Sequence, residues 1–240
     1  MFQIFKKELN SFLDSLIGYI VIGVFLTATG LFTWFFKDNI LDFGYADMGL
    51  FFQISPFIFL FLIPAITMKA FSEEVKSGTI ELLFTKPLSK WQIVLGKYLA
   101  SCFLILLSLI PTLLYYYSVY QLGNPQGNVD SAAVFSSYLG LFLLGCVFAG
   151  IGVLMSAFTD NQVTAFVLSF VICLILFYGI GQLAQLPFMG DFGYVFNQLG
   201  LDYQYNALGK GLLDSRNIIY FLSVIFLTLW ATKLRISTLK

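Results

Sequence analysis

Residues Ser131 to Thr159 read SAAVFSSYLGLFLLGCVFAGIGVLMSAFT, a stretch of 29 residues without a charged side chain. A helix rises about 1.5 Å per residue, so roughly 20 apolar residues cross the ~30 Å hydrocarbon core of a bilayer. The stretch exceeds this length and contains no proline. It therefore predicts a transmembrane helix.

Five further stretches have the same character, which gives six predicted spans. Four are free of charge and long enough to cross: Ser15–Phe36, Met48–Met68, the run from Tyr98 up to but not including Asp130, and Asn161–Gly190. Asn217–Thr232 has only 16 residues, but Arg216 and Lys233 can reach the membrane surface from its two ends. We therefore predict an all-α polytopic membrane protein, with residues 1–240 forming one transmembrane domain.

The composition agrees with this fold class. Of the 240 residues, 59% are hydrophobic and 11% are charged, whereas about 25% charged residues are usual in soluble domains. The mean hydropathy is +0.87. Thirteen basic and thirteen acidic residues cancel, so no electrostatic attraction to nucleic acid is expected.

The distribution of basic residues predicts the orientation, because Lys and Arg concentrate in cytoplasmic loops. Ten lie at the two ends of the chain and between spans two and three: Lys6, Lys7, Lys69, Lys76, Lys86, Lys90, Lys97, Lys233, Arg235 and Lys240. The opposite side has only three, Lys37, Lys210 and Arg216. Both termini are therefore expected in the cytoplasm.

The predicted spans contain no Asp, Glu, Lys, Arg or His. Ion-coupled carriers usually place ionisable groups in the membrane, so we expect the driving force to come from elsewhere. The chain has no histidine to activate a nucleophile, and its three cysteines are isolated. We predict no catalytic residue, no metal site and no cofactor bound by this chain.

Residues 1–16 have the pattern of an amphipathic helix. Phe2, Phe5 and Leu9 recur at helical spacing, with Lys6 and Lys7 on the other face. Such a helix lies in the membrane interface with its apolar side towards the lipid. Two interpretations remain open: a simple anchor, or a lever joined to the first span.

The cytoplasmic segment 69–97 is predicted to begin as an extension of span two. The helix can continue through Glu73 and Glu74 to Lys76, and Gly78 can end it because glycine tolerates left-handed dihedrals. We expect the carboxylates of Glu73 and Glu74 to be exposed at this loop.

A second, short helix is predicted after Gly78. Thr79 can cap it, Glu81 suits its first turn, and Pro87 follows its end. Ser89 and Gln92 have the spacing of a capping box that starts span three. The short helix would present an apolar ridge formed by Leu82, Leu83 and Phe84, although a plain connector remains an alternative.

The segment 179–216 on the outer side is rich in glycine and aromatic residues. It is too apolar for a solvated loop and too interrupted for a continuous span. Short re-entrant or interfacial helices fit this composition, provided that protein covers their backbone. We place the re-entrant segment at 187–216.

Small residues form a stripe along the fourth span, at Gly145, Ala149, Gly152 and Ser156. Such stripes allow helices to approach closely in membranes. We therefore predict that Gly145, Ala149 and Gly152 are helix-packing residues.

The sequence EEVKSGTIELL at residues 73–83, followed by Pro87 and by Gly96–Lys97, resembles the signature of type-2 ABC exporter permeases. The opening residues Phe5, Lys6, Lys7 and Glu8 are similar to the interfacial helix of that family. Six spans and cytoplasmic termini agree with its layout, so the resemblance covers essentially the whole chain. More narrowly, the overall sequence resembles the gliding-motility ABC permeases of the F-subunit type.

The resemblance implies a permease subunit of an export complex in a bacterial inner (cytoplasmic) membrane. A separate ABC ATPase, in two copies, would hold ATP and Mg, since the chain has no GxxxxGK[ST] motif. It would contact the coupling residues Glu73, Glu74, Gly78, Thr79, Glu81, Leu82, Leu83 and Pro87, together with the amino-terminal helix. A second permease chain, identical or different, would complete the complex.

Two other function classes are alternatives to a permease. A membrane anchor or scaffold of a larger machine would need the same attachment surface, so the sequence leaves it open. An ion-coupled carrier is disfavoured by the charge-free spans.

Overall fold

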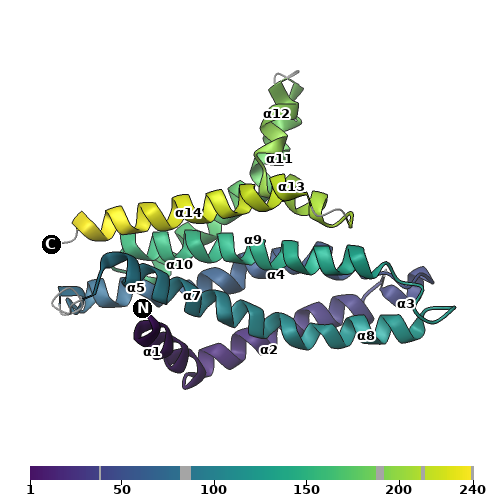
Figure 1. Cartoon of the computed structure of the whole chain (residues 1–240), viewed down its shortest axis with the longest axis horizontal. Coiled ribbons are helices and arrows are strands. Elements are labelled where there is room, and N and C mark those ends of the chain that lie inside the picture. Colours follow the sequence, from purple (N-terminus) through teal and green to yellow (C-terminus); the bar gives the residue numbers. More distant parts are fainter. Residues whose placement is uncertain (38, 82–87, 188–191, 212–213, 239–240) are drawn as a thin grey trace.

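The computed structural model describes residues 1–37, 39–81, 88–187, 192–211 and 214–238, which form helices and no strands. Most helices run side by side along the long axis of the molecule (Figure 1). Both termini and the end of α5 (Lys69–Lys76) lie at the same end of this bundle. The structure thus places together the three regions that the distribution of basic residues assigned to one side.

Five helical stretches are long and apolar enough to cross a membrane: Gly49–Lys76, Lys90–Leu122, Ser131–Phe158, Gln162–Ala184 and Ser215–Thr238. A sixth is obtained if the bent pair Phe2–Leu13 and Gly18–Trp34 counts as one span. The two members of this pair, α1 (Phe2–Leu13) and α2 (Leu16–Trp34), meet at 66°. The prediction of a polytopic helical membrane protein is confirmed.

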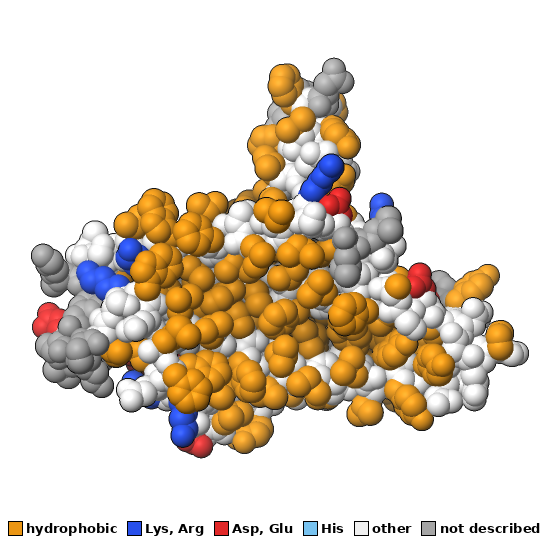
Figure 2. All heavy atoms as spheres, in the orientation of Figure 1, with side chains coloured by type: hydrophobic (Ala, Val, Ile, Leu, Met, Phe, Trp, Pro, Cys, Tyr) orange, Lys and Arg blue, Asp and Glu red, His pale blue; other side chains and the backbone are white. Residues whose placement is uncertain are grey.

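The surface has the distribution of side chains that a bilayer requires. Hydrophobic side chains cover the middle of the bundle on the face shown in Figure 2, and the charged side chains visible there lie near its two ends and at the base of the arm that stands away from it. Because lipid tails cannot solvate charge, this arrangement favours a bilayer around the middle of the bundle.

The core is built around α9 (Ser131–Phe158). It packs against α4 (Gly49–Thr67), α5, α7 (Lys90–Leu109), α10 (Gln162–Leu174), α13 (Leu201–Leu208) and α14 (Ser215–Thr238). In the most apolar 18-residue stretch of α9, 78% is buried. The corresponding share is 22% for the span that begins with α10 and 17% for α14. The first stretch quoted above is therefore the central helix, while α10 and α14 leave most of their surface free.

Span three is interrupted near its middle. The turn η1 (Ile110–Thr112) contains Pro111 and separates α7 from α8 (Leu113–Leu122). Pro111 lacks the N–H of a regular helical turn, so an interruption here has a clear cause. Just after this turn, the Tyr115 hydroxyl donates to the carbonyl of Leu26 at 2.9 Å and ties α8 to α2.

The outer segment consists of short helices. Span five continues from α10 through a π-helical turn, η2 (Ile175–Gly179), into α11 (Ile180–Ala184). The helix α12 (Phe192–Gln198) packs against α11, and the two stand away from the bundle beside α13 (Figure 1). A short helix, α3 (Ile40–Phe43), lies between α2 and α4. The sixth span, α14, is longer than the predicted Asn217–Thr232 because its helix continues to Thr238.

Candidate functional site

The helix α5 continues span two beyond its apolar part and ends where the sequence predicts. The Gly78 N–H donates to Val75 O at 3.2 Å, and Gly78 has φ +68°. A side chain is strained at this φ, so glycine is the suitable residue for this position.

Only the beginning of the segment after Gly78 is described. The Thr79 hydroxyl lies 2.8 Å from the Ser77 hydroxyl, Ile80 is buried and Glu81 is exposed. Leu82, Leu83 and Pro87 lie outside the described residues, as does the rest of the predicted short helix.

The predicted capping box at the start of α7 is confirmed. Ser89 Oγ accepts from the Gln92 N–H at 3.3 Å, and Gln92 Oε1 accepts from the Ser89 N–H at 3.1 Å. Between these two residues, Trp91 stacks on Phe226 with ring centroids 6.4 Å apart, and the Lys233 ammonium lies 5.1 Å from the centroid of the Trp91 ring. These contacts fix the start of span three against the end of span six.

The amino-terminal helix α1 packs on α7 as well as on α2. Ile4 is buried against Gly96, where an added Cβ would lie 2.9 Å from two carbon atoms of Ile4. Phe5 meets Phe103 edge to face, with ring centroids 6.0 Å apart. Gly96 thus lets α1 lie directly on span three.

A buried ion cluster joins α1, α5 and α7. Lys97 on α7 is 4% exposed, and its Nζ donates to Glu8 Oε1 and to Glu74 Oε1, both at 2.9 Å. The same ammonium lies 5.0 Å from the centroid of the Phe71 ring. Across the described ranges these are the only two ion pairs. Removing one partner of a buried pair is strongly destabilising, so this cluster fixes how the three helices meet.

The expectation that Glu73 and Glu74 are both exposed is wrong for Glu74. Glu73 is exposed, but the Glu74 side chain is only 16% exposed and pairs with Lys97. Consecutive helical residues differ by about 100° around the axis, so one carboxylate faces water while the next faces α7. Lys6 and Lys7 are exposed on α1, whereas Glu8 turns inwards.

No functional role is predicted for Lys97 from the sequence, in which it directly precedes span three. The sequence nevertheless contains a sign of the ion cluster, because Lys97 follows Gly96 and stands at the start of a long apolar run. A lysine at that depth requires an acidic partner, and Glu8 and Glu74 stand on the two segments predicted to share its side of the membrane.

The small-residue stripe of α9 faces α4 and α7. A Cβ on Gly152 would lie 1.9 Å from Thr67 Oγ1, and one on Gly145 would lie 3.0 Å from Ile105 Cγ2. Ala149 is fully buried, and Ser156 Oγ accepts a hydrogen bond from the Phe71 N–H at 3.1 Å. The last contact ties the beginning of α5 to the central helix.

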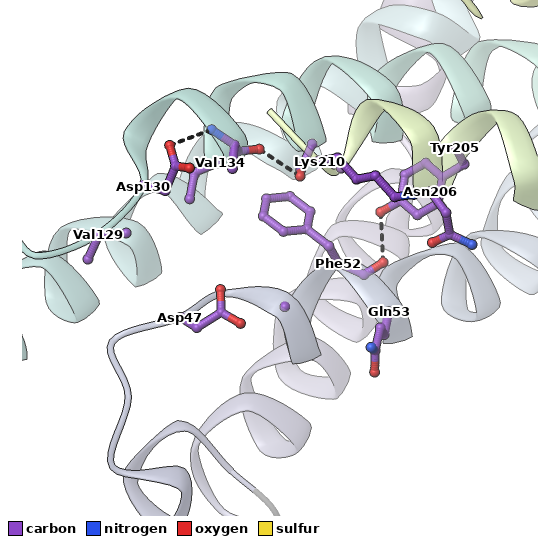
Figure 3. A pocket seen from close by; sticks show the side chains of 13 residues that line it. Asp47, Phe52, Gln53, Val129, Asp130, Val134, Tyr205, Asn206 and Lys210 are labelled. Atoms are coloured by element: carbon purple, nitrogen blue, oxygen red, sulfur yellow. Dashed lines mark hydrogen bonds between the residues drawn. The ribbon is translucent and has the colours of Figure 1, made fainter. Parts of the chain in front are cut away.

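A hollow of about 350 Å³ lies at the other end of the bundle. Figure 3 shows Asp47 before α4, Asp130 before α9, and Lys210 with Asn206 at α13. Asp130 accepts from the N–H groups of Ala132 and Ala133 and caps the central helix. Three elements that are separate in the sequence form this hollow, so no local pattern in the sequence predicts it.

The pocket wall of Figure 3 is fixed by a hydrogen bond between elements. Tyr205 on α13 donates to the carbonyl of Phe52 on α4 at 2.7 Å. One turn before Asn206 on α13, burial raises the pKa of Asp202, and a hydrogen bond from Asn206 partly opposes this shift. Within the described residues, no group of three or more His, Cys, Asp or Glu side chains could hold a metal ion.

The arrangement therefore offers one end with linked helices, where both termini lie, and an opposite end with a small polar hollow. A comparison with curated proteins gives no match. The sequence profile of the ABC-2 family transporter proteins matches residues 3–192. The profile thus spans α1 and the ion cluster, and reaches the start of α12. The chain belongs to the ABC-2 transporter family and is a membrane subunit of an ABC transporter.

Proposed function

We propose that the chain is the permease of an ATP-driven export complex, and that its ATPase subunit binds the face formed by α1, the end of α5 and the residues after Gly78. Membership of the ABC-2 family implies such a partner. The observation that carries the proposal is the ion cluster of Glu8, Glu74 and Lys97, which ties this face to span three. A force applied there is transmitted because the helices are joined, not merely adjacent.

The path from this face into the membrane runs along α4. The helix α5 extends span two, and Ser156 holds its first turn to the central helix. Movement of α5 therefore moves the cytoplasmic half of α4. The packing of Gly152 on Thr67 makes α9 the body against which α4 shifts.

The proposed contact with a second permease chain is the aromatic face shared by α4 and α10. Phe57 lies 5.7 Å from Phe177, and Phe61 lies 4.6 Å from Phe170, measured between ring centroids. Phe57 and Phe61 are 46% and 56% exposed. A second copy or a different permease would cover these rings, and the outer segment 187–216 would act as a gate beside them. ATP hydrolysis would drive either the export of a substrate or a surface machine such as that of gliding motility.

The ATPase contact is tested by charge reversal that leaves the ion cluster intact. Glu73→Lys combined with Glu81→Lys should reduce the amount of P-loop ATPase that co-purifies from native membranes about tenfold. This corresponds to a loss of about 1.4 kcal/mol in binding free energy. The matched control is Asp47→Lys, an exposed acid at the opposite end of the bundle. Undiminished ATPase in the Glu73 and Glu81 variant would contradict the proposed face.

Reconstitution into liposomes distinguishes a permease from a scaffold. The complex purified with its ATPase is placed in liposomes, and ATP-dependent movement of candidate cargo from the native envelope is measured. Cargo movement that stops with the double variant supports a permease. ATP hydrolysis without movement of any cargo supports the anchor or scaffold instead.

A further inference from the structure

A cleft of about 340 Å³ opens beside the ion cluster, between α1, α5 and α7. Lys7 and Lys69 line it together with Glu74 and Lys97. Neither Lys7 nor Lys69 forms an ion pair within the described ranges, whereas Lys97 is held by two carboxylates. Glu8 and Glu73 line the cleft too, so it combines two ammonium groups outside the ion cluster with three carboxylates, of which Glu8 and Glu74 are paired with Lys97.

One polar atom at this cleft has no partner. Glu74 Oε2 is buried and accepts no hydrogen bond, although Glu74 Oε1 accepts from Lys97. Lys97 donates to Glu8 and to Glu74 Oε1 and lies against the Phe71 ring, and it donates no hydrogen bond to Oε2. A buried carboxylate oxygen without a donor is costly. A donor that enters the cleft can therefore gain a hydrogen bond to the Glu74 carboxylate.

The surroundings of the cleft favour a lipid as the source of that donor. The cleft borders the amphipathic helix α1 and reaches Ser15, which precedes span one. Leu16, directly after Ser15, is 74% exposed and offers apolar surface to an acyl chain. By the distribution of Lys and Arg, this end of the bundle lies at the level of the cytoplasmic head groups.

We infer that the cleft binds the head group of a phospholipid that carries a primary ammonium, as in phosphatidylethanolamine. The ammonium donates to the Glu74 carboxylate, whose side chain is 16% exposed, and the phosphate accepts from Lys7 and Lys69. Both ends of the zwitterion then meet opposite charge, and charge-assisted hydrogen bonds are stronger than neutral ones. A choline head group has the same charge but no N–H donor, and a glycerol head group has no ammonium. This inference depends on the membrane position of the chain and not on its ATPase partner.

The test compares lipids that differ only in the head group. The full chain is purified in detergent, incubated with equimolar phosphatidylethanolamine, phosphatidylcholine and phosphatidylglycerol of identical acyl chains, and analysed by native mass spectrometry. We expect phosphatidylethanolamine to be retained about tenfold more than either other lipid, since a hydrogen bond to a charged group is worth about that factor or more. Glu74→Gln should remove this preference, because the amide no longer supplies a charged acceptor. The matched control, Glu81→Gln, changes an exposed acid outside the cleft and should keep the preference.

Helix content and elution volume show whether Glu74→Gln is folded; Lys97 still has Glu8 as its partner in this variant. Equal retention of phosphatidylethanolamine and phosphatidylcholine would overturn the inference, because water alone would then satisfy Glu74. Preferential retention of phosphatidylglycerol would also overturn the inference, because Lys7 and Lys69 would then bind an anionic phosphate without an ammonium group. In a last experiment, soluble phosphoethanolamine competes with the bound phosphatidylethanolamine. If it displaces the lipid at equal concentration, the ligand is a small molecule and the lipid assignment fails.

Discussion

At position 152 the central helix has no room for a side chain. An added Cβ would lie 1.9 Å from Thr67 Oγ1 and 2.8 Å from Thr67 Cβ, and Thr67 is fixed by its hydrogen bond to the carbonyl of Ile63 at 2.9 Å. The neighbour therefore cannot turn away at low cost. Gly23 on α2 provides the contrast, since an added Cβ there meets nothing within 4 Å.

We predict that Gly152→Ala lowers the free energy of unfolding by about 1–3 kcal/mol, the usual cost of overpacking a core. Gly23→Ala should be neutral or slightly stabilising, because alanine is the better helix former. Cys102, Cys146 and Cys173 are buried, so a thiol-reactive fluorescent dye reports unfolding as temperature rises. Equal melting temperatures for the two variants would show that α4 and α9 are not packed this closely.

Among the elements, α1, α5 and α7 form the least expected association. Three segments that are distant in sequence meet through Glu8, Glu74 and Lys97, and Gly96 permits the close approach of α1. The amino-terminal helix has an apolar face, as a membrane anchor would, but part of that face packs on span three. This favours the lever over the simple anchor among the two interpretations of the sequence.

Breaking the cluster from its centre should separate these elements. Lys97→Met leaves two largely buried carboxylates without a cation, and we expect a loss on the order of 3 kcal/mol in unfolding free energy. The triple variant Glu8→Gln, Glu74→Gln and Lys97→Met removes the charges together and should recover most of that loss. The same dye assay measures both. If the triple variant is no more stable than Lys97→Met, lost packing of the lysine stem and not uncompensated charge explains the effect.

For the whole molecule, the two ends of the bundle should face different compartments. Figure 1 shows α5 and both termini at one end, and the chain between α2 and α4 at the other. Tyr45, in that connection, is 79% exposed, and Ser77 after α5 is exposed too. Because the native cysteines are buried, a single new cysteine can be labelled without removing them.

We predict that Tyr45→Cys reacts with a membrane-impermeant maleimide in intact cells, and that Ser77→Cys reacts only after permeabilisation. The physical reason is the excess of Lys and Arg at the end that carries Ser77. Unmodified protein provides the background. Labelling of Ser77→Cys, but not of Tyr45→Cys, in intact cells would reverse the orientation.

Features that depend on local chemistry follow from the order of the amino acids alone. Charge-free stretches of sufficient length predicted the spans because a bilayer excludes charge, and Gly78 and the Ser89–Gln92 pair marked helix ends because caps involve neighbouring residues. Only the tertiary structure decided which surfaces these helices bury. Glu73 and Glu74 are indistinguishable as a sequence pair, but the position of Lys97 on another helix buries one of them. The outer hollow of Figure 3 has the same origin, since its walls come from three segments and depend on how α13 packs against α4 and α9.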